Sequence, residues 1–297
     1  MLSSLLWLFL LSLFVNFNAE RMQKIAVVTG SNQGIGKEIA KELSSVGCKT
    51  ILACRNLEAA KSAATEIGGD NVDIRQLDIS SKESIDSFTE SLMKDYPCVD
   101  ILVNNAAMAF KGSDPTPFDR QARPTISINY FGTLWLTEKM MPLLKKSSSG
   151  RIVNVASQAG LLRIMKSQEK KAEFTSPSLT IDRLNELMNE FIEDVEAKTH
   201  ASKGWPGTTY GMSKLGVIAL TKILARENPK MLINCCCPGY CATGMSSYGG
   251  HGSKEAADKV GFRDAGTGAK TPVMLSLLPD ESVETGKFFL DNREIEW

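Results

Sequence analysis

A tyrosine and a lysine four residues apart, Tyr210 and Lys214, have side chains suited to acid–base chemistry. On a helix, residues at this spacing leave from one face. The ordinary pKa of tyrosine is about 10, and a neighbouring ammonium favours the phenolate, so we expect Lys214 to lower the pKa of Tyr210. Such pairs also recur by chance on ordinary helices, so the surrounding residues decide whether this one is catalytic.

Two polar residues extend this pair to a catalytic set of Asn129, Ser157, Tyr210 and Lys214. Ser157 ends an apolar, β-branched run and would donate a hydrogen bond to a substrate carbonyl as negative charge develops on its oxygen. Asn129 is expected to hold Lys214 through a water molecule. Ser157 and Tyr210 are therefore also expected to contact the substrate.

A glycine-rich turn, Thr29-Gly-Ser-Asn-Gln-Gly-Ile-Gly36, follows the first apolar run. Its glycines let the backbone approach a pyrophosphate, and the free amides and dipole of the following helix attract an anion. The pattern also occurs in ordinary strand-to-helix turns, but its place in the first βαβ unit of a parallel sheet favours a dinucleotide. The expected cofactor contacts in this turn are Gly30, Asn32, Gln33, Gly34, Ile35 and Gly36.

The end of the second apolar run, Ile51-Leu-Ala-Cys-Arg55, indicates which dinucleotide is bound. A site for NAD places a carboxylate here to bind the ribose hydroxyls, and that carboxylate would repel a 2′-phosphate. Arg55 has no acid beside it and would pair with a 2′-phosphate through charge-assisted hydrogen bonds. The alternative is a solvated surface arginine. We expect NADPH and NADP+ as the cofactor pair.

Short β-branched runs alternate with longer amphipathic stretches along the chain, which is typical of βαβ units. The expected strands are 24–30, 49–55, 72–78, 101–105, 151–157, 232–237 and 287–290. The expected helices are 35–45, 58–67, 82–95, 121–146 and 210–227. Several strands are almost continuously apolar, as expected when helices cover both faces of a sheet. The sequence predicts an α/β fold with a Rossmann-type, doubly wound, seven-stranded parallel sheet.

A polar and helical insert of about residues 161–205 precedes the catalytic tyrosine. It contains one amphipathic helix, which we expect to pack on the surface of the domain. The apolar residues at helical spacing are Leu184, Leu187, Met188, Phe191, Ile192 and Val195. Without an internal repeat or a low-complexity linker, residues 20–297 are expected to form a single Rossmann-type domain.

The composition is typical of a globular protein that binds a small molecule. Apolar residues make up 43% and charged residues 23% of the chain, and the formal net charge is zero, which argues against disorder and against a nucleic-acid partner. The chain has seven cysteines, and this odd number does not suit a framework of disulfides, so we expect reduced thiols. Because His200 and His251 lack zinc-ligand spacing to those thiols, no metal is expected.

Residues 1–19 form an apolar segment without a charged side chain. The segment is short against the roughly 20 residues that a spanning helix needs, and it suits the core of a signal sequence. Phe17 occupies a position where a cleavable signal prefers a small residue, and Arg21 and Lys24 follow the segment closely. We expect residues 2–15 to tether the protein to the endoplasmic reticulum membrane, facing the cytosol. The alternatives are a soluble cytoplasmic protein and a secreted one.

Together these motifs resemble the short-chain dehydrogenase/reductase family. The motifs that carry the resemblance are Thr29-Gly-x-x-x-Gly-x-Gly36, Asn104-Asn-Ala-Ala107, Asn129, Ser157, Tyr210-x-x-x-Lys214 and Pro238-Gly239. Within the family the chain is most similar to the monomeric NADPH-dependent carbonyl reductases. The segments shared with those enzymes are Ala109-Phe-Lys, Asp114-Pro-Thr-Pro-Phe118, Gly204-Trp-Pro and Glu296-Trp297.

The resemblance implies that NADPH gives hydride to a ketone or aldehyde while Tyr210 gives a proton to its oxygen. It implies that Asn32 and Arg55 hold the 2′-phosphate and that Tyr240 borders the substrate. The further cofactor contacts that it implies are Asp78 and Ile79 beside the adenine, and Asn105, Tyr210, Lys214, Pro238 and Gly239 along the cleft. A monomer is expected, because the insert helix would cover the face that related tetramers use.

Two residues in the site depart from the family pattern: Ala107 replaces a glycine, and Gly244 replaces a common aspartate. Two other functions remain open. One is a membrane-associated dehydrogenase or reductase of a steroid- or retinoid-like lipid, which the apolar N-terminus suggests. The other is a non-catalytic NADP-binding protein, which loss of Tyr210 or Lys214 would have favoured; both are present.

Overall fold

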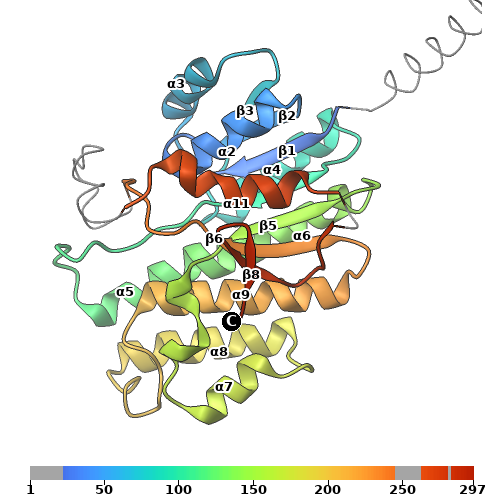
Figure 1. The fold of residues 1–297 in the computed structure, drawn as a ribbon. Helices are drawn as coiled ribbons and strands as arrows, with labels where there is room; N and C mark the ends of the chain where they lie inside the picture. Colours follow the sequence, from blue (N-terminus) through green and yellow to red (C-terminus); the bar gives the residue numbers. More distant parts are fainter. Residues whose placement is uncertain (1–22, 245–261, 280–281) are drawn as a thin grey trace, which may run out of the picture.

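The structure is a computed structural model that describes residues 23–244, 262–279 and 282–297, and it contains the predicted doubly wound α/β sheet (Figure 1). The strand order is β3-β2-β1-β4-β5-β6-β7-β8, and the pairs from β3 to β7 are parallel. The strands are β1 (Ile25–Thr29), β2 (Lys49–Cys54), β3 (Val72–Gln76), β4 (Ile101–Asn104), β5 (Arg151–Val155), β6 (Leu232–Cys237), β7 (Phe288–Leu290) and β8 (Arg293–Ile295). All seven predicted strands are confirmed.

The described sheet has an eighth strand, so the predicted count of seven was too low. β8 runs antiparallel to β7 and holds only three residues, two of them charged and exposed, which gives no apolar run in the sequence. The chain reverses at Asp291 and Asn292, whose φ angles are 51° and 61°. Positive φ at both central residues is typical of a tight hairpin turn.

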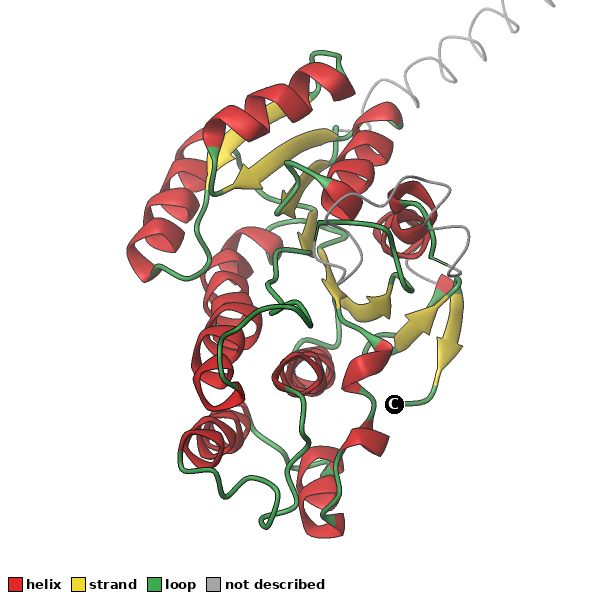
Figure 2. Ribbon diagram, turned by 90° about the vertical axis from the view of Figure 1, so that its left-hand side faces the viewer, coloured by secondary structure: helices red, strands yellow, loops and turns green. Residues whose placement is uncertain are grey.

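Helices cover both faces of the sheet (Figures 1 and 2). Side chains of α2 (Gly34–Ser45), α3 (Leu57–Ile67) and α11 (Ala265–Leu277) join one hydrophobic cluster of the sheet. Those of α4 (Lys82–Asp95), α6 (Thr133–Leu144) and α9 (Thr209–Glu227) join the other. The sequence did not predict α11, because its glycines and Pro272 obscure the helical pattern.

The predicted helix 121–146 is interrupted. It consists of α5 (Phe118–Ile126), a π-helical turn η1 (Ser127–Gly132) and α6. The π-helical turn lies inside a continuous helical run and contains no proline that would mark it, so the sequence did not reveal it. Asn129 lies within this turn.

The insert forms two helices, α7 (Gln168–Thr175) and α8 (Ile181–Glu196), of which the sequence predicted α8. Figure 1 shows them beyond α9, on the side away from the sheet. The apolar residues of α8 predicted to pack are all buried: Leu184, Leu187, Met188, Phe191, Ile192 and Val195. α8 packs on α5 and α9. The monomer itself stays a prediction.

The predicted tether, residues 2–15, lies outside the described residues, as does all of the segment 1–19. Among the helices that the structure describes, none combines the length and the apolar character that a bilayer crossing needs.

Candidate active site

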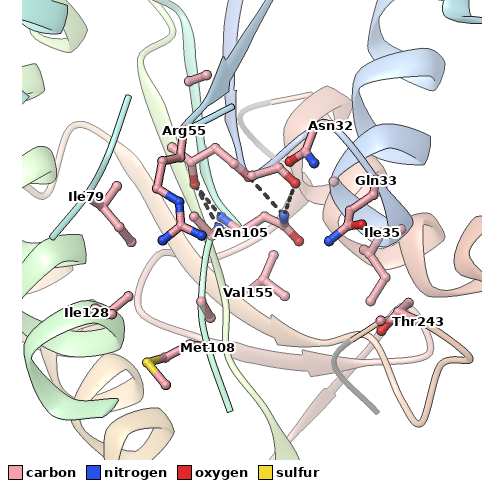
Figure 3. Close-up of a pocket in the computed structure, with 18 of the residues that line it drawn as sticks. Asn32, Gln33, Ile35, Arg55, Ile79, Asn105, Met108, Ile128, Val155 and Thr243 are labelled. Carbon is pink, nitrogen blue, oxygen red and sulfur yellow. Dashed lines mark hydrogen bonds between the residues drawn. The ribbon is translucent and has the colours of Figure 1, made fainter. Parts of the chain in front are cut away.

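A cavity of about 530 Å³ opens at the carboxyl ends of β1 and β4, where the strand order reverses (Figure 3). Ligands of doubly wound sheets bind at such switch points. The predicted cofactor residues that line it are Gly30, Asn32, Gln33, Gly34, Ile35, Gly36, Arg55, Asp78, Ile79, Asn105, Tyr210, Lys214 and Pro238. The fold therefore brings together, in one cavity, residues that are spread over more than half of the chain.

The glycine-rich turn forms one wall of the cavity, and its glycines meet a conformational or a packing requirement. Gly30 and Gly34 have φ angles of 64° and 56°, which favour glycine. A Cβ on Gly36 would lie 2.4 Å from both the Gly30 carbonyl oxygen and Asn105 Nδ2. At the N-terminus of α2, Gln33 makes no side-chain capping bond in the described chain, so the first amides of the helix are left to bind an anion.

Two residues fasten the end of β1 to the end of β4. Asn105 Nδ2 donates to the carbonyl oxygens of Thr29 (2.9 Å) and Gly30 (3.3 Å), as the dashed lines in Figure 3 show. The buried Thr29 Oγ1 accepts hydrogen bonds from the amides of Asn105 (3.0 Å) and Ala106 (2.9 Å). Thr29 was not predicted as a site residue, although it begins the glycine motif.

Arg55 lies exposed at the end of β2, on the same side of the cavity as Ile79 (Figure 3). Its neighbour Asp78 accepts hydrogen bonds from Ser80 N (2.9 Å) and Ser80 Oγ (2.6 Å). Burial alone would raise the pKa of Asp78, but these bonds and the charge of Arg55 outweigh it and lower the pKa. Asp78 therefore stays ionised and held by Ser80, and the donors of Arg55 face the cavity.

Tyr210 and Lys214 lie in the first turns of α9, which Thr208 caps by accepting a hydrogen bond from Gly211 N (3.0 Å). Lys214 Nζ donates to the carbonyl oxygen of Val155 (2.7 Å) and lies 5.7 Å from the centre of the Tyr210 ring. Both side chains thus leave one face of the helix toward the end of β5, as predicted. Burial lowers the pKa of Lys214 to about 8.

The expectation that Lys214 lowers the pKa of Tyr210 was wrong for this structure. Burial raises the pKa of Tyr210 to about 12, the charge of Cys237 adds to this effect, and a hydrogen bond with Ser157 only partly opposes it. The physical reason is desolvation of the hydroxyl, which disfavours the phenolate more than a nearby positive charge favours it. Tyr210 consequently keeps its proton at neutral pH.

Ser157 follows β5 and caps a 3-10 turn, η2 (Gln158–Gly160), by accepting a hydrogen bond from Ala159 N (3.1 Å). Its side chain also bonds to Tyr210, so the two predicted catalytic hydroxyls lie together. Ser157 lies beside the cavity rather than in its lining.

The side chain of Asn129 bonds to residues other than Lys214, and the expected contact with Lys214 through water stays a prediction. The buried amide accepts from Met108 N (2.8 Å) and donates to Met108 O (2.8 Å) and Ser213 Oγ (3.0 Å). Through these bonds the amide joins three parts of the chain: η1, α9 and the segment that follows β4. Asn129 therefore fixes Met108, which lines the cavity, against the helix that carries Tyr210 and Lys214.

Gly239 and Tyr240 do not line the cavity. Gly239 has a φ of 79° and packs under Arg263, whose side-chain atoms lie 3.0 Å from the place of a Cβ. The Tyr240 ring is 77% exposed and contacts Phe262, with 6.0 Å between the ring centres. Tyr240 is not among the described residues that line the cavity, so its contact with substrate stays a prediction.

The remaining wall residues are mostly small or apolar, and the sequence did not mark them as cofactor contacts. Apart from Thr29, they are Ala53, Leu77, Ala106, Ala107, Met108, Ile128, Val155, Ala156, Ala242, Thr243 and Gly244. The two departures from the family pattern fit here without strain. The Ala107 side chain lines open space, and a Cβ on the exposed Gly244 would meet only Gln33 Nε2, at 3.9 Å.

Comparison with known proteins gives consistent matches. The sequence profile described as short chain dehydrogenase matches residues 24–168. Carbonyl reductase (NADPH) 1 of Macaca fascicularis is 37% identical over 286 residues, which cover 92% of this chain and 98% of that protein. The structure of salutaridine reductase from Papaver somniferum is similar with a TM-score of 0.80 and 30% identity, over 91% of this chain and 100% of that one. The structure of menthone neomenthol reductase from Mentha piperita is also similar, with a TM-score of 0.75 and 29% identity, over 90% of this chain and 98% of that one.

Proposed function

The chain belongs to the short-chain dehydrogenase/reductase family, and we propose on that basis that it is an NADPH-dependent carbonyl reductase of ketones and aldehydes. The observation that carries the proposal is the single cavity that joins the glycine-rich turn, Arg55 and the Tyr210–Lys214 pair. A nucleotide site and an acid–base pair at one switch point are what hydride transfer to a carbonyl requires.

The residues that line the cavity suit each part of the cofactor. The tight turn from Gly30 to Gly36, in which Gly36 packs against the Gly30 carbonyl oxygen, would present the first amides of α2 to a pyrophosphate. Arg55 and Asn32 would bind the 2′-phosphate. Asp78 and Ile79 would border the adenine, and Asn105, Lys214 and Pro238 would line the cleft toward the nicotinamide. When bound, NADPH supplies the hydride.

The protein side of the reaction is proton transfer at the Tyr210 hydroxyl. With its pKa raised to about 12, Tyr210 is protonated at neutral pH and donates that proton to the substrate oxygen as charge develops there. Ser157, bonded to the same hydroxyl, orients the carbonyl. Lys214 keeps a positive charge below its pKa of about 8, which stabilises the phenolate that remains.

The reduction rate is expected to fall as pH rises through about 8. Burial depresses the pKa of Lys214 to about 8, so its charge is present below that pH and lost above it, whereas Tyr210 stays protonated until its pKa of about 12. The measurement is kcat/KM for a stable aromatic ketone between about pH 6 and about pH 10. The melting temperature at each pH serves as control for unfolding, and a rate that stays flat to the alkaline limit contradicts this role of Lys214.

A screen of NADPH oxidation tests the proposed function against its alternatives. The panel contains aromatic aldehydes, aliphatic ketones, quinones, and steroid and retinoid carbonyls. Consumption of NADPH with small carbonyls supports the proposal. Turnover confined to the steroids or retinoids favours the lipid enzyme, and NADPH binding without any turnover favours the non-catalytic protein.

We also propose that residues 2–15 tether the protein to the endoplasmic reticulum membrane on its cytosolic side. The support is the charge-free apolar run and the basic residues Arg21 and Lys24 after it. The full-length protein is expected to stay in the pellet after a carbonate wash, and a truncated variant beginning at Arg21 is expected in the supernatant. A mature N-terminus at Glu20, or release of the full-length protein into the supernatant, would contradict the proposed tether.

A further inference from the structure

We propose that Trp297 is a positioning residue that holds Ser157 in place for catalysis. Its indole Nε1 donates a hydrogen bond to the carbonyl oxygen of Gly160 (3.1 Å), the last residue of η2. Ser157 begins this turn and lies 140 residues before Trp297 in the sequence. The inference rests on the function proposed above, because it assigns a role within that site.

The turn between them is short and closed, so the position of Gly160 determines that of Ser157. Gly160 N donates to Ser157 O (2.9 Å), and Ala159 N donates to Ser157 Oγ (3.1 Å). Both the backbone and the side chain of Ser157 are therefore bonded inside the turn that Trp297 contacts. A shift of the Gly160 carbonyl would change the direction of the Ser157 hydroxyl.

The same turn packs closely on α9. A Cβ on Gly160 would lie 2.5 Å from Leu215 N and from the carbonyl carbon of Lys214, and a Cβ on Gly211 would lie 2.6 Å from Ala159 O. The turn thus packs backbone to backbone against the helix that carries the acid–base pair and has no room to move toward it. The hydrogen bond from Trp297 adds a constraint on the Gly160 carbonyl.

The β7–β8 hairpin brings Trp297 to this position. β8 returns antiparallel along β7, and the chain then ends beside α9, as Figure 1 shows. The indole ring packs on the cluster that contains Leu161 and Phe288, and Lys222 Nζ of α9 lies 5.7 Å from the ring centre. The ring is consequently anchored by packing, and its N–H reaches the Ser157 turn.

The orientation of Ser157 matters more for turnover than for cofactor binding. A hydrogen bond to a carbonyl oxygen weakens steeply when the donor is misaligned, and small errors of position lower the rate of a reaction strongly. Ser157 lies outside the cavity lining that would hold the nucleotide. Loss of the Trp297 bond should therefore lower kcat and leave NADPH affinity unchanged.

The primary test is Trp297→Phe, which keeps an aromatic ring and removes the N–H donor. We expect kcat for carbonyl reduction to fall about three- to tenfold, as for the loss of one hydrogen bond. The dissociation constant of NADPH and the melting temperature are expected to match those of the wild type. The matched control is Lys222→Met, which removes the cation beside the same ring, keeps the N–H donor and is expected to leave kcat unchanged.

A double-mutant cycle shows whether the effect passes through Ser157. In a Ser157→Ala background, measured at high enzyme concentration, Trp297→Phe is expected to cause no further loss of kcat. The same fold loss in both backgrounds overturns the proposal, and so does wild-type kcat in the single variant. A lower melting temperature with weaker NADPH binding would show a merely structural role and also overturns it. If the wild-type protein reduces no carbonyl, the proposed function is refuted, and this inference is refuted with it.

Discussion

Tyr210→Phe is expected to lower kcat for carbonyl reduction by about a hundred- to ten-thousandfold, the usual contribution of a general acid. The phenylalanine ring still packs at the start of α9, but the proton that Tyr210 holds at neutral pH is gone. NADPH binding should persist, because the glycine-rich turn and Arg55 are untouched. The measurements are kcat at saturating NADPH and the dissociation constant of NADPH from quenching of protein fluorescence.

Tyr96→Phe is the matched control for this prediction. Tyr96 ends α4, and its hydroxyl donates to Asp73 (2.9 Å), outside the residues that line the cavity. Its loss should leave kcat unchanged. If Tyr210→Phe keeps more than about one tenth of the wild-type kcat, a contribution of the size typical of a general acid is excluded.

Arg55→Asp is expected to raise the KM for NADPH about ten- to a hundredfold and to spare the KM for NADH. Each tenfold change corresponds to about 1.4 kcal/mol, which one or two charge-assisted hydrogen bonds supply. The new carboxylate would stand beside Asp78, where it repels a 2′-phosphate and suits the ribose hydroxyls of NADH. Initial rates with each cofactor give both constants.

Arg123→Gln is a suitable control for the loss of a surface arginine. Arg123 lies on α5 and binds Glu196 at the end of α8, away from the cavity. Both KM values should stay at the wild-type level. Equal use of NADPH and NADH by the wild type, or an unchanged KM for NADPH in Arg55→Asp, removes the basis for the cofactor assignment.

The sequence predicted the parallel part of the sheet because buried strands are almost continuously apolar, as in 101–105 and 232–237. It did not predict elements whose cause is tertiary. β8 owes its strand geometry to the turn at Asp291 and Asn292, and its own residues are charged. The π-helical turn at Asn129 continues the helical run without a proline inside it, so one helix was expected where three segments occur.

The predicted site residues meet in one cavity where a motif fixes backbone geometry. The glycine-rich turn and the Tyr210–Lys214 pair reach the cavity because their spacing has few structural solutions. Electrostatics was less predictable: burial of Tyr210 outweighs the effect of Lys214, and burial depends on the packed fold. The Asn129 amide bonds to Met108 and Ser213, partners that no spacing in the sequence indicates.

The central claim is hydride transfer from NADPH to a carbonyl carbon, and isotope transfer measures it directly. The wild-type protein is incubated with an aromatic ketone and NADPH that carries deuterium at the transferable position of its C4. The account predicts one deuterium on the carbinol carbon of the alcohol for each NADPH consumed. Tight NADPH binding with no labelled alcohol from any carbonyl of the panel would contradict it.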